Sequence, residues 1–215
     1  SEDKPRVLTV SGLPRVPSGD FHPDRDRTLE LAARRLIAEQ TGGLNVGYLE
    51  QLYTFGDRFR DPRELAGEPR LVSVVYLALV GRDAAVKAPA HVAWREWYAH
   101  LPWEDARESR AERAAVASFV AKRGGNPALR ERARILFGLK GAPWNDRAVL
   151  ERYELLYELG AVAESGAGGA AFGNPMTHDH RRILATAIGR MRGKIAYRPI
   201  IFELLPTEFT LSELQ

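Results

Sequence analysis

The charged residues of segment 27–42, RTLELAARRLIAEQTG, have the spacing that comes closest to metal-ion chemistry. Mg²⁺ prefers several carboxylate oxygens, and carboxylates four residues apart on a helix lie on one face. Glu30 and Glu39 are nine residues apart, which at about 100 degrees per residue places them on opposite sides of a helix. They cannot share an ion. Glu39 is therefore either a solvated ion-pair partner of Arg35, four residues earlier, or a weak metal ligand.

Segment 54–63, TFGDRFRDPR, combines residue types that recognise nucleotides. The candidates are Phe55, Gly56, Arg58, Phe59, Arg60 and Arg63. Arginines can form paired hydrogen bonds with a pyrophosphate, glycine permits unusual backbone angles, and an aromatic ring can stack on adenine. The alternative is a polar hairpin loop in which the arginines pair with Asp57 and Asp61. Phe55 alone is more typical of a core residue.

A row of basic residues without any acidic residue lies between His180 and Ile201. It consists of Arg181, Arg182, Arg190, Arg192, Lys194 and Arg198. Such a row could contact the phosphates of DNA or of a nucleotide, and the alternative is a solvated helix face. His178 and His180 do not align on one helical face, and no carboxylate trio completes a zinc site. We therefore predict no metal centre, with Glu39 as the one weak candidate ligand.

The composition is that of an ordinary globular chain. Its 215 residues are 45% hydrophobic and 27% charged, with a net charge of +3, which suits one large domain or two small ones. No apolar run approaches the roughly 20 residues that span a bilayer, and the start of the chain is no signal peptide. The absence of cysteine excludes disulfides and thiolate chemistry. We expect a soluble, cytoplasmic protein without a membrane partner.

The first half of the chain reads as strands around one helix. We expect strands at 6–10, 46–55 and 71–80, the last covered on both faces because it is almost continuously apolar. The helix should begin after Thr28 and stop at Gly42. Its buried stripe should comprise Leu29, Ala32, Ala33, Leu36 and Ile37. We expect an aromatic plug on the sheet edge, formed by Trp94, Trp97, Tyr98, Pro102 and Trp103.

The second half is mostly helical, which makes the fold class α+β. Three helices are expected between about 108 and 159, with starts at Asn126 and Asp146 and stops at Gly138 and Gly160. A flexible Gly/Ala loop at 164–175 precedes another helix, and a final strand is expected at 200–206. The apolar face of that helix should hold Leu184, Ala187, Ile188, Met191 and Ile195.

The end of the first segment, ARRLIAEQTG, resembles the C-terminal half of the Nudix box, G-x5-E-x7-R-E-U-x-E-E-x-G-U, where U is bulky and aliphatic. Arg35 matches the arginine of the box, Ile37 matches U and Glu39 matches a glutamate. Other box positions are occupied by different residue types, namely Phe21, Arg27, Leu36 and Gln40. The resemblance implies a retained fold whose hydrolytic chemistry is lost, which leaves a role for Mg²⁺ in doubt.

Longer phrases resemble the Nudix-related transcriptional regulators of NAD metabolism, the NrtR type. They include YLEQLYTFGDRFRDPR, VSVVYLALV and HDHRRILATAIGRMRGKIAYRPIIFELLP, while WREWY, PWED, APWND and VLERYELLYELG resemble the alphaproteobacterial branch. The similarity covers nearly the whole chain. It implies a Nudix-like α/β/α sandwich with a mixed sheet in residues 1–206 and a helical insertion at about 106–173. Residues 207–215 would begin a truncated winged helix-turn-helix domain, so the chain would be a fragment.

The resemblance also implies a function. The chain would be the nucleotide-sensing domain of a repressor of NAD biosynthesis genes, binding ADP-ribose, NAD or ATP without hydrolysis, without catalytic residues and without a cofactor. Arg34, Glu39 and Glu50 then join segment 54–63 as effector contacts, while Arg190, Arg192 and Lys194 lie near the DNA. Operator DNA would be bound only by the full-length protein, as a homodimer. The alternative is a divergent Nudix hydrolase of ADP-ribose or a related nucleoside diphosphate derivative.

Overall fold

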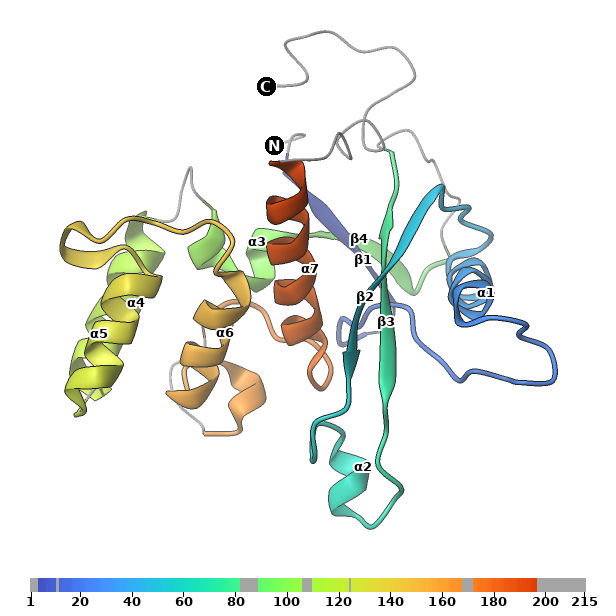
Figure 1. Ribbon diagram of the computed structural model, residues 1–215, viewed down its shortest axis with the longest axis horizontal. Coiled ribbons are helices and arrows are strands. Elements are labelled where there is room, and N and C mark those ends of the chain that lie inside the picture. The colour runs from blue at the N-terminus through green and yellow to red at the C-terminus, as the bar shows by residue number, and fades with distance from the viewer. Residues whose placement is uncertain are drawn as a thin grey trace, which may run out of the picture. The chain divides into compact units, whose positions relative to one another are not determined.

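The computed structural model describes residues 4–10, 12–81, 89–105, 110–123, 125–167 and 172–196. These residues form a mixed α+β structure with two small antiparallel sheets, which confirms the expected class (Figure 1). The chain divides into two compact units. We call Ser1–Val7 with Arg95–Arg192 the helical unit, and Leu8–Trp94 with Gly193–Gln215 the sheet unit. The mixed sheet of a Nudix sandwich is not found among the described residues and stays a prediction.

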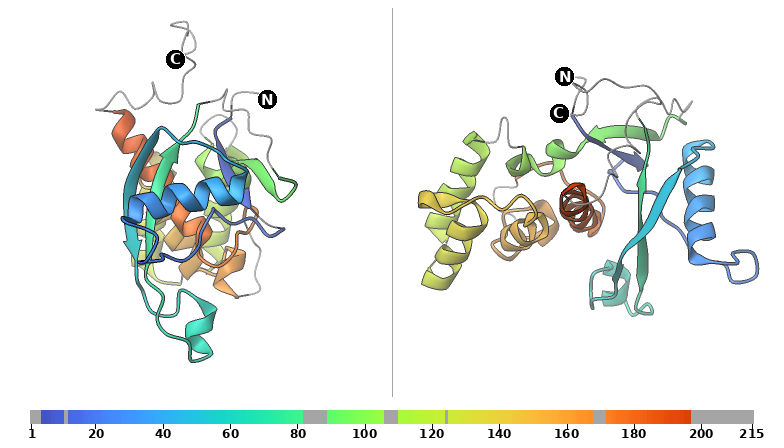
Figure 2. Two further views of the ribbon diagram at one scale, coloured as in Figure 1. Left: turned by 90° about the vertical axis from the view of Figure 1, so that its right-hand side faces the viewer. Right: turned by 45° about the horizontal axis from the view of Figure 1, so that its top comes forward.

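The sheet unit is built on a long hairpin covered by one helix. Its elements are α1 (Leu29–Thr41), β2 (Tyr48–Phe55), α2 (Pro62–Leu65) and β3 (Ser73–Leu79). β2 and β3 pair antiparallel, with Tyr48 opposite Leu79 and an irregularity between Gln51 and Tyr53. α1 packs against both strands, as Figures 1 and 2 show, and α2 lies in the connection at the end of the hairpin.

Helix α1 begins and ends where the sequence predicts. The Thr28 hydroxyl accepts a hydrogen bond from the Leu31 amide at 3.1 Å, and Gly42 ends the helix in the left-handed region at φ 76°. Ala32 is buried, but Leu29 is 41% exposed, so its expected burial was wrong. An apolar stripe is buried only where a neighbouring element covers it, and the described sheet beneath α1 has two strands.

Strand β3 also differs from its expectation. The apolar run at 71–80 predicted a strand covered on both faces, yet within β3 only Leu79 is buried. Val72, just before the strand, is 58% exposed. Among the described residues β3 pairs with β2 alone, so it lacks the neighbours on both sides that a central strand would have.

The second sheet pairs β1 (Arg6–Val10) with β4 (Val92–Glu96). The Thr9 hydroxyl donates to the Ala93 carbonyl at 3.1 Å. The aromatic plug expected beside this sheet is only partly formed. Trp94, in β4, is 39% exposed, whereas Trp103 is fully buried in the helical unit. These aromatic residues are close in sequence, which predicted that they would pack together. Successive side chains of a strand point to opposite faces and those of a helix point around its axis, so neighbours in sequence can lie in different surroundings.

The helical unit contains the remaining elements. They are α3 (Trp97–His100), η1 (Pro102–Glu104), α4 (Arg110–Arg123), α5 (Pro127–Leu136), η2 (Leu139–Gly141), α6 (Val149–Glu158), η3 (Ala163–Ser165) and α7 (His180–Ile195), whose last turn crosses into the sheet unit. α4 packs on α5 and α5 on α6 (Figure 1). Asn126 caps α5 as expected, accepting from Ala128 N at 2.9 Å. The expected start at Asp146 was wrong, because the chain turns once more before α6 begins at Val149.

A single buried carboxylate joins three segments of the helical unit, namely η1, α6 and α7. Both oxygens of Glu104 accept from Arg152, at 2.5 and 2.9 Å, and Arg192 donates to the same carboxylate at 2.6 Å. Arg152 also donates to the carbonyls of Leu136 and Asn145. The side chains of Glu104 and Arg152 have no exposed surface. Buried charges of this kind are tolerated because each one is paired and hydrogen-bonded.

The Gly/Ala segment at 164–175 is anchored on both sides of residues 168–171, which lie outside the described residues. Glu164 forms an ion pair with the fully buried Arg181 and accepts from Met176 N at 2.9 Å. Gly173 has φ 69°, and a Cβ there would lie 2.2 Å from the His100 carbonyl oxygen. The expected flexibility was therefore wrong for Glu164 and Gly173, because an ion pair and a close backbone approach fix them.

Three expectations fall on undescribed residues: the strand at 200–206, the winged-helix start at 207–215, and the place of Arg198. Within the described ranges no helix is both long enough and apolar enough to cross a membrane. Along α7 the apolar face holds Leu184, Ile188 and Met191, which are buried as expected, whereas Ile195 is 45% exposed near the helix end.

Replacing Glu104 with glutamine should destabilise the protein by about 3–5 kcal/mol, because it leaves two arginines in the interior without a counter-charge. Urea unfolding followed by circular dichroism measures the free energy. Glu131→Gln is the matched control, since Glu131 pairs with Arg134 on the surface of α5 and its loss should have little effect. Equal, small losses for both variants would contradict the proposed importance of the Glu104 network.

Candidate functional site

The segment that contains α1 and the turn before it folds around the guanidinium of Arg35. Its Nε and Nη2 donate to the two oxygens of Asp26, at 2.8 and 2.7 Å. Nη1 donates to Glu39 at 3.0 Å, and Nη2 also reaches the Asp20 carbonyl at 3.1 Å. Two carboxylates and a carbonyl oxygen thus converge on one cationic group.

Local structure explains this convergence. Arg35 and Glu39 are one helical turn apart on α1, so their side chains meet on the same face. Asp26 belongs to the turn before α1, where its carboxylate accepts from His22 N at 2.9 Å. The hydrogen bond from Arg35 holds the pKa of Asp26 far below its usual value, and Asp26 in turn raises the pKa of Arg35. Sequence reasoning missed Asp26 because helical spacing says nothing about a residue outside the helix.

Glu39, the weak candidate metal ligand, is held by two arginines. Arg25 donates to it at 2.8 Å and Arg35 at 3.0 Å. Glu30 pairs instead with Arg34, at 3.0 Å. Across the described ranges no three His, Asp or Glu side chains gather as a metal ion requires. A cation approaching Glu39 meets two guanidinium groups, which oppose its binding.

Arg34 lies beside a hollow at the C-terminal half of α1. The hollow has a volume of about 340 Å³ and is lined by Arg34, Arg35, Ala38 and residues 43–46. Arg34 donates to the Val46 carbonyl at 2.6 Å, which links the helix to the segment before β2. Two arginines thus line a small cavity, with Arg34 paired to Glu30 and Arg35 paired to Asp26 and Glu39.

Segment 54–63 does not assemble as one cluster. Phe55 is 4% exposed and packs edge-on against Tyr53. It is therefore a core residue, which is the alternative to base stacking that its sequence context favoured. Gly56 does not have a positive φ, and a Cβ there would make only ordinary contact with Val72. The expectation that Gly56 provides unusual backbone angles was therefore wrong. Phe59, by contrast, is 53% exposed and has φ 61°.

The three arginines of this segment have different partners. Arg60 donates to the Ser73 hydroxyl at 2.8 Å and lies 5.6 Å from the Phe55 ring. Arg63 pairs with Asp61, at 2.8 Å, which raises the pKa of Arg63. Arg58 is 69% exposed, with its Nε 3.9 Å from Glu64. The described geometry brings no two of these guanidinium groups onto a shared ligand position.

Glu50 lies in a separate cluster on β2. It accepts from the Tyr48 hydroxyl at 2.7 Å and forms an ion pair with Lys194. Burial raises the pKa of Tyr48, and the hydrogen bond to Glu50 raises the pKa of Lys194. Lys194 is only 7% exposed, so this lysine is tied to the sheet unit and does not face solvent.

The basic row on α7 is largely paired with carboxylates from other elements. Arg181 pairs with Glu164, Arg182 with Glu154, Arg192 with Glu104 and Lys194 with Glu50. Arg190 is exposed. The row has no acidic residue in sequence, but the fold brings one acid to each of these four cations. Arg192 and Lys194 therefore hold carboxylates of other elements, and their expected place near DNA stays a prediction.

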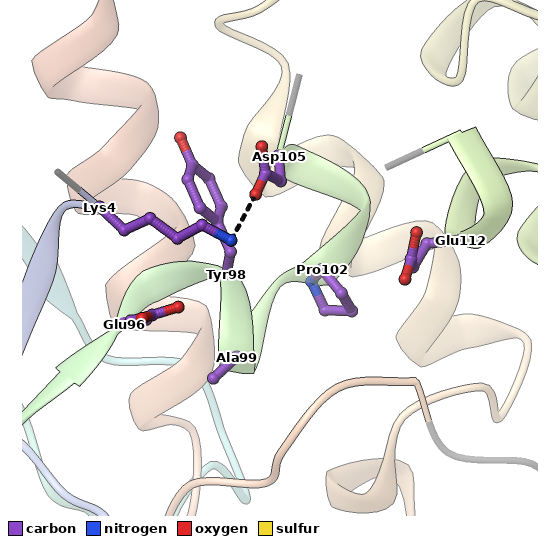
Figure 3. A pocket seen from close by; sticks show the side chains of 7 residues that line it. All are labelled: Lys4, Glu96, Tyr98, Ala99, Pro102, Asp105 and Glu112. Carbon is purple, nitrogen blue, oxygen red and sulfur yellow. Dashed lines mark ion pairs between the residues drawn. The ribbon is translucent and has the colours of Figure 1, made fainter. Parts of the chain in front are cut away.

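A second hollow, of about 190 Å³, lies within the helical unit. Its charged lining comprises Lys4, Glu96, Asp105 and Glu112 (Figure 3). Lys4 reaches Asp105 at 3.3 Å. Sequence reasoning missed this hollow because about ninety residues separate Lys4 from its neighbours and no motif connects them.

No protein-family model matches the chain, and no curated protein matches it.

Asp26→Asn should lower the melting temperature at pH 7, because it removes the charged partner of Arg35. The folded-state pKa of Asp26 is depressed, so its stabilising contribution is complete above the unfolded value of about 3.8 and declines as pH falls below it. The difference in melting temperature between wild type and variant should therefore decrease as the pH falls from about 4 to about 2. Thermal unfolding followed by circular dichroism measures the melting temperatures of both proteins at each pH. Asp24→Asn, an exposed change in the same loop, is the control; the same pH-dependent gap for both variants would contradict the assignment.

Proposed function

We propose that this chain is the nucleotide-sensing domain of a transcriptional repressor of NAD biosynthesis genes. It binds an effector of the ADP-ribose, NAD or ATP type and does not hydrolyse it. The proposal rests on the resemblance of segment 27–42 and of the longer phrases to Nudix-related regulators. The α+β architecture is compatible with it, and a Nudix-like sandwich with a helical insertion at about 106–173 is part of the proposal.

The observation that carries the absence of hydrolysis is the pairing of Glu39. Metal-assisted cleavage of a pyrophosphate needs Mg²⁺ held by several carboxylates. At the position where the box has its glutamates, this chain has one carboxylate held by Arg25 and Arg35, with Leu36 and Gln40 nearby in sequence. A protein that can bind an anion but has no cluster of carboxylates to hold a metal ion is suited to bind a nucleotide and leave it intact.

Arg58 is the contact we favour for the effector phosphates, because its side chain is 69% exposed and lies 3.9 Å from Glu64. Arg34 lines the 340 Å³ hollow, but it is already paired with Glu30 and with the Val46 carbonyl. Operator binding, homodimerisation and a winged helix beginning at 207–215 belong to the same proposal. Of the basic residues expected near DNA, Arg190 is the best candidate, since Arg192 and Lys194 hold buried or half-buried carboxylates.

Isothermal titration calorimetry should detect binding of ADP-ribose, NAD or ATP with a dissociation constant of about micromolar order, equivalent to roughly 8 kcal/mol. Incubation with Mg²⁺ or Mn²⁺ should release no AMP. Arg58→Gln should weaken binding about tenfold, whereas Arg134→Gln, on the surface of α5, should leave it unchanged.

Two results would overturn this proposal in different ways. No heat with any of the three ligands would exclude nucleotide sensing. Release of AMP that Glu39→Gln abolishes would instead establish a divergent Nudix hydrolase.

A further inference from the structure

The turn that carries Phe59 has a strained backbone. Among the described residues, three non-glycine residues have a positive φ: Phe59 at 61°, Lys140 at 50° and His178 at 50°. The left-handed conformation is unfavourable for a bulky side chain and persists only where its surroundings enforce it. Phe59 is 53% exposed, so burial of its ring does not fully offset that cost. An exposed aromatic ring held in a strained turn calls for a role other than packing.

Neighbouring side chains hold this turn in place. The Phe59 amide donates to the Glu64 carboxylate at 2.7 Å, and the Glu64 side chain is only 11% exposed. Glu64 belongs to α2, whose first turn is capped by Asp61 through a hydrogen bond from Arg63 N at 2.9 Å. The ring of Phe59 is therefore presented from a fixed backbone, which lowers the entropy lost when a ligand binds.

A cationic group lies over one face of the ring and leaves the opposite face for a stacking partner. The guanidinium carbon of Arg58 is 5.0 Å from the centre of the Phe59 ring. Arg58 is 69% exposed, and its 3.9 Å separation from Glu64 is too long for a hydrogen bond. A flat apolar surface next to an exposed guanidinium matches a ligand with a planar aromatic ring and a nearby negative charge. A nucleotide has both.

We propose that Phe59 stacks on the base of the bound nucleotide and that Arg58 contacts its phosphate. This assignment rests on the nucleotide binding proposed above and adds the residue that distinguishes a base-bearing ligand from a bare phosphate. Phe55, the other aromatic ring of segment 54–63, is not available for stacking because it is buried beneath Arg60 and Tyr53.

The test compares Phe59→Asn with the wild type. Asparagine adopts the left-handed region more readily than phenylalanine and has no aromatic ring. We expect an unchanged or higher melting temperature, together with about tenfold weaker binding of ATP and ADP-ribose by calorimetry. Binding of pyrophosphate, which has no base, should not change. Phe59→Trp, which keeps a stacking surface, should retain nucleotide affinity.

Leu65→Ala is the control, because Leu65 is a 70% exposed apolar residue in the same hairpin connection, and it should bind all ligands like the wild type. Equal nucleotide affinity of wild type and Phe59→Asn would overturn the stacking role. So would a parallel loss of pyrophosphate affinity, or a large loss of stability, which a packing role predicts. Failure of the wild type to bind any nucleotide would instead overturn the proposed function.

Discussion

Compensation of buried charge is the constraint on which this structure depends. Glu104 is fully buried and serves two arginines, one from α6 and one from α7, while its own backbone belongs to η1. Because a buried ion without a partner is far costlier than a lost surface contact, any packing of these elements that separated the three charges would be strongly disfavoured. The helices around these charges bury apolar surface, and the ion pairs favour one placement of the helices relative to one another.

The same requirement explains why charge patterns in the sequence were poor guides to function. The basic row on α7 and the arginines of segment 54–63 both suggested phosphate binding. In the fold, four cations of α7 meet an acid from a distant part of the chain, such as Glu154 for Arg182 or Glu50 for Lys194, whereas Arg63 pairs with Asp61 of its own loop. A run of like charges along one helix says nothing about the acidic residues that other elements bring to it. Ion pairs between elements decide which charged side chains stay accessible to a ligand.

Local rules were sufficient for much of the fold. Thr28, Gly42 and Asn126 fix helix ends through their own hydrogen bonds or backbone angles, so α1 and α5 could be placed from sequence. The burial of side chains could not be predicted in this way, because it depends on which elements pack against them. Leu29 and Trp94 are large apolar residues, and both are exposed. Within the candidate site, Arg34 and Glu39 were found by motif and spacing. Asp26 was not, since its contact with Arg35 arises from a loop that returns to the helix.

The environment of Arg35 has a consequence for how such a site could change. Asp26, Glu39 and the Asp20 carbonyl already surround a single positive charge with hard oxygen atoms. Removing this one guanidinium would leave the carboxylates of Asp26 and Glu39 without the positive charge that lies between them, although Arg25 would still pair with Glu39. Asp26, in the turn before α1, is thus held against the helix by a single side chain.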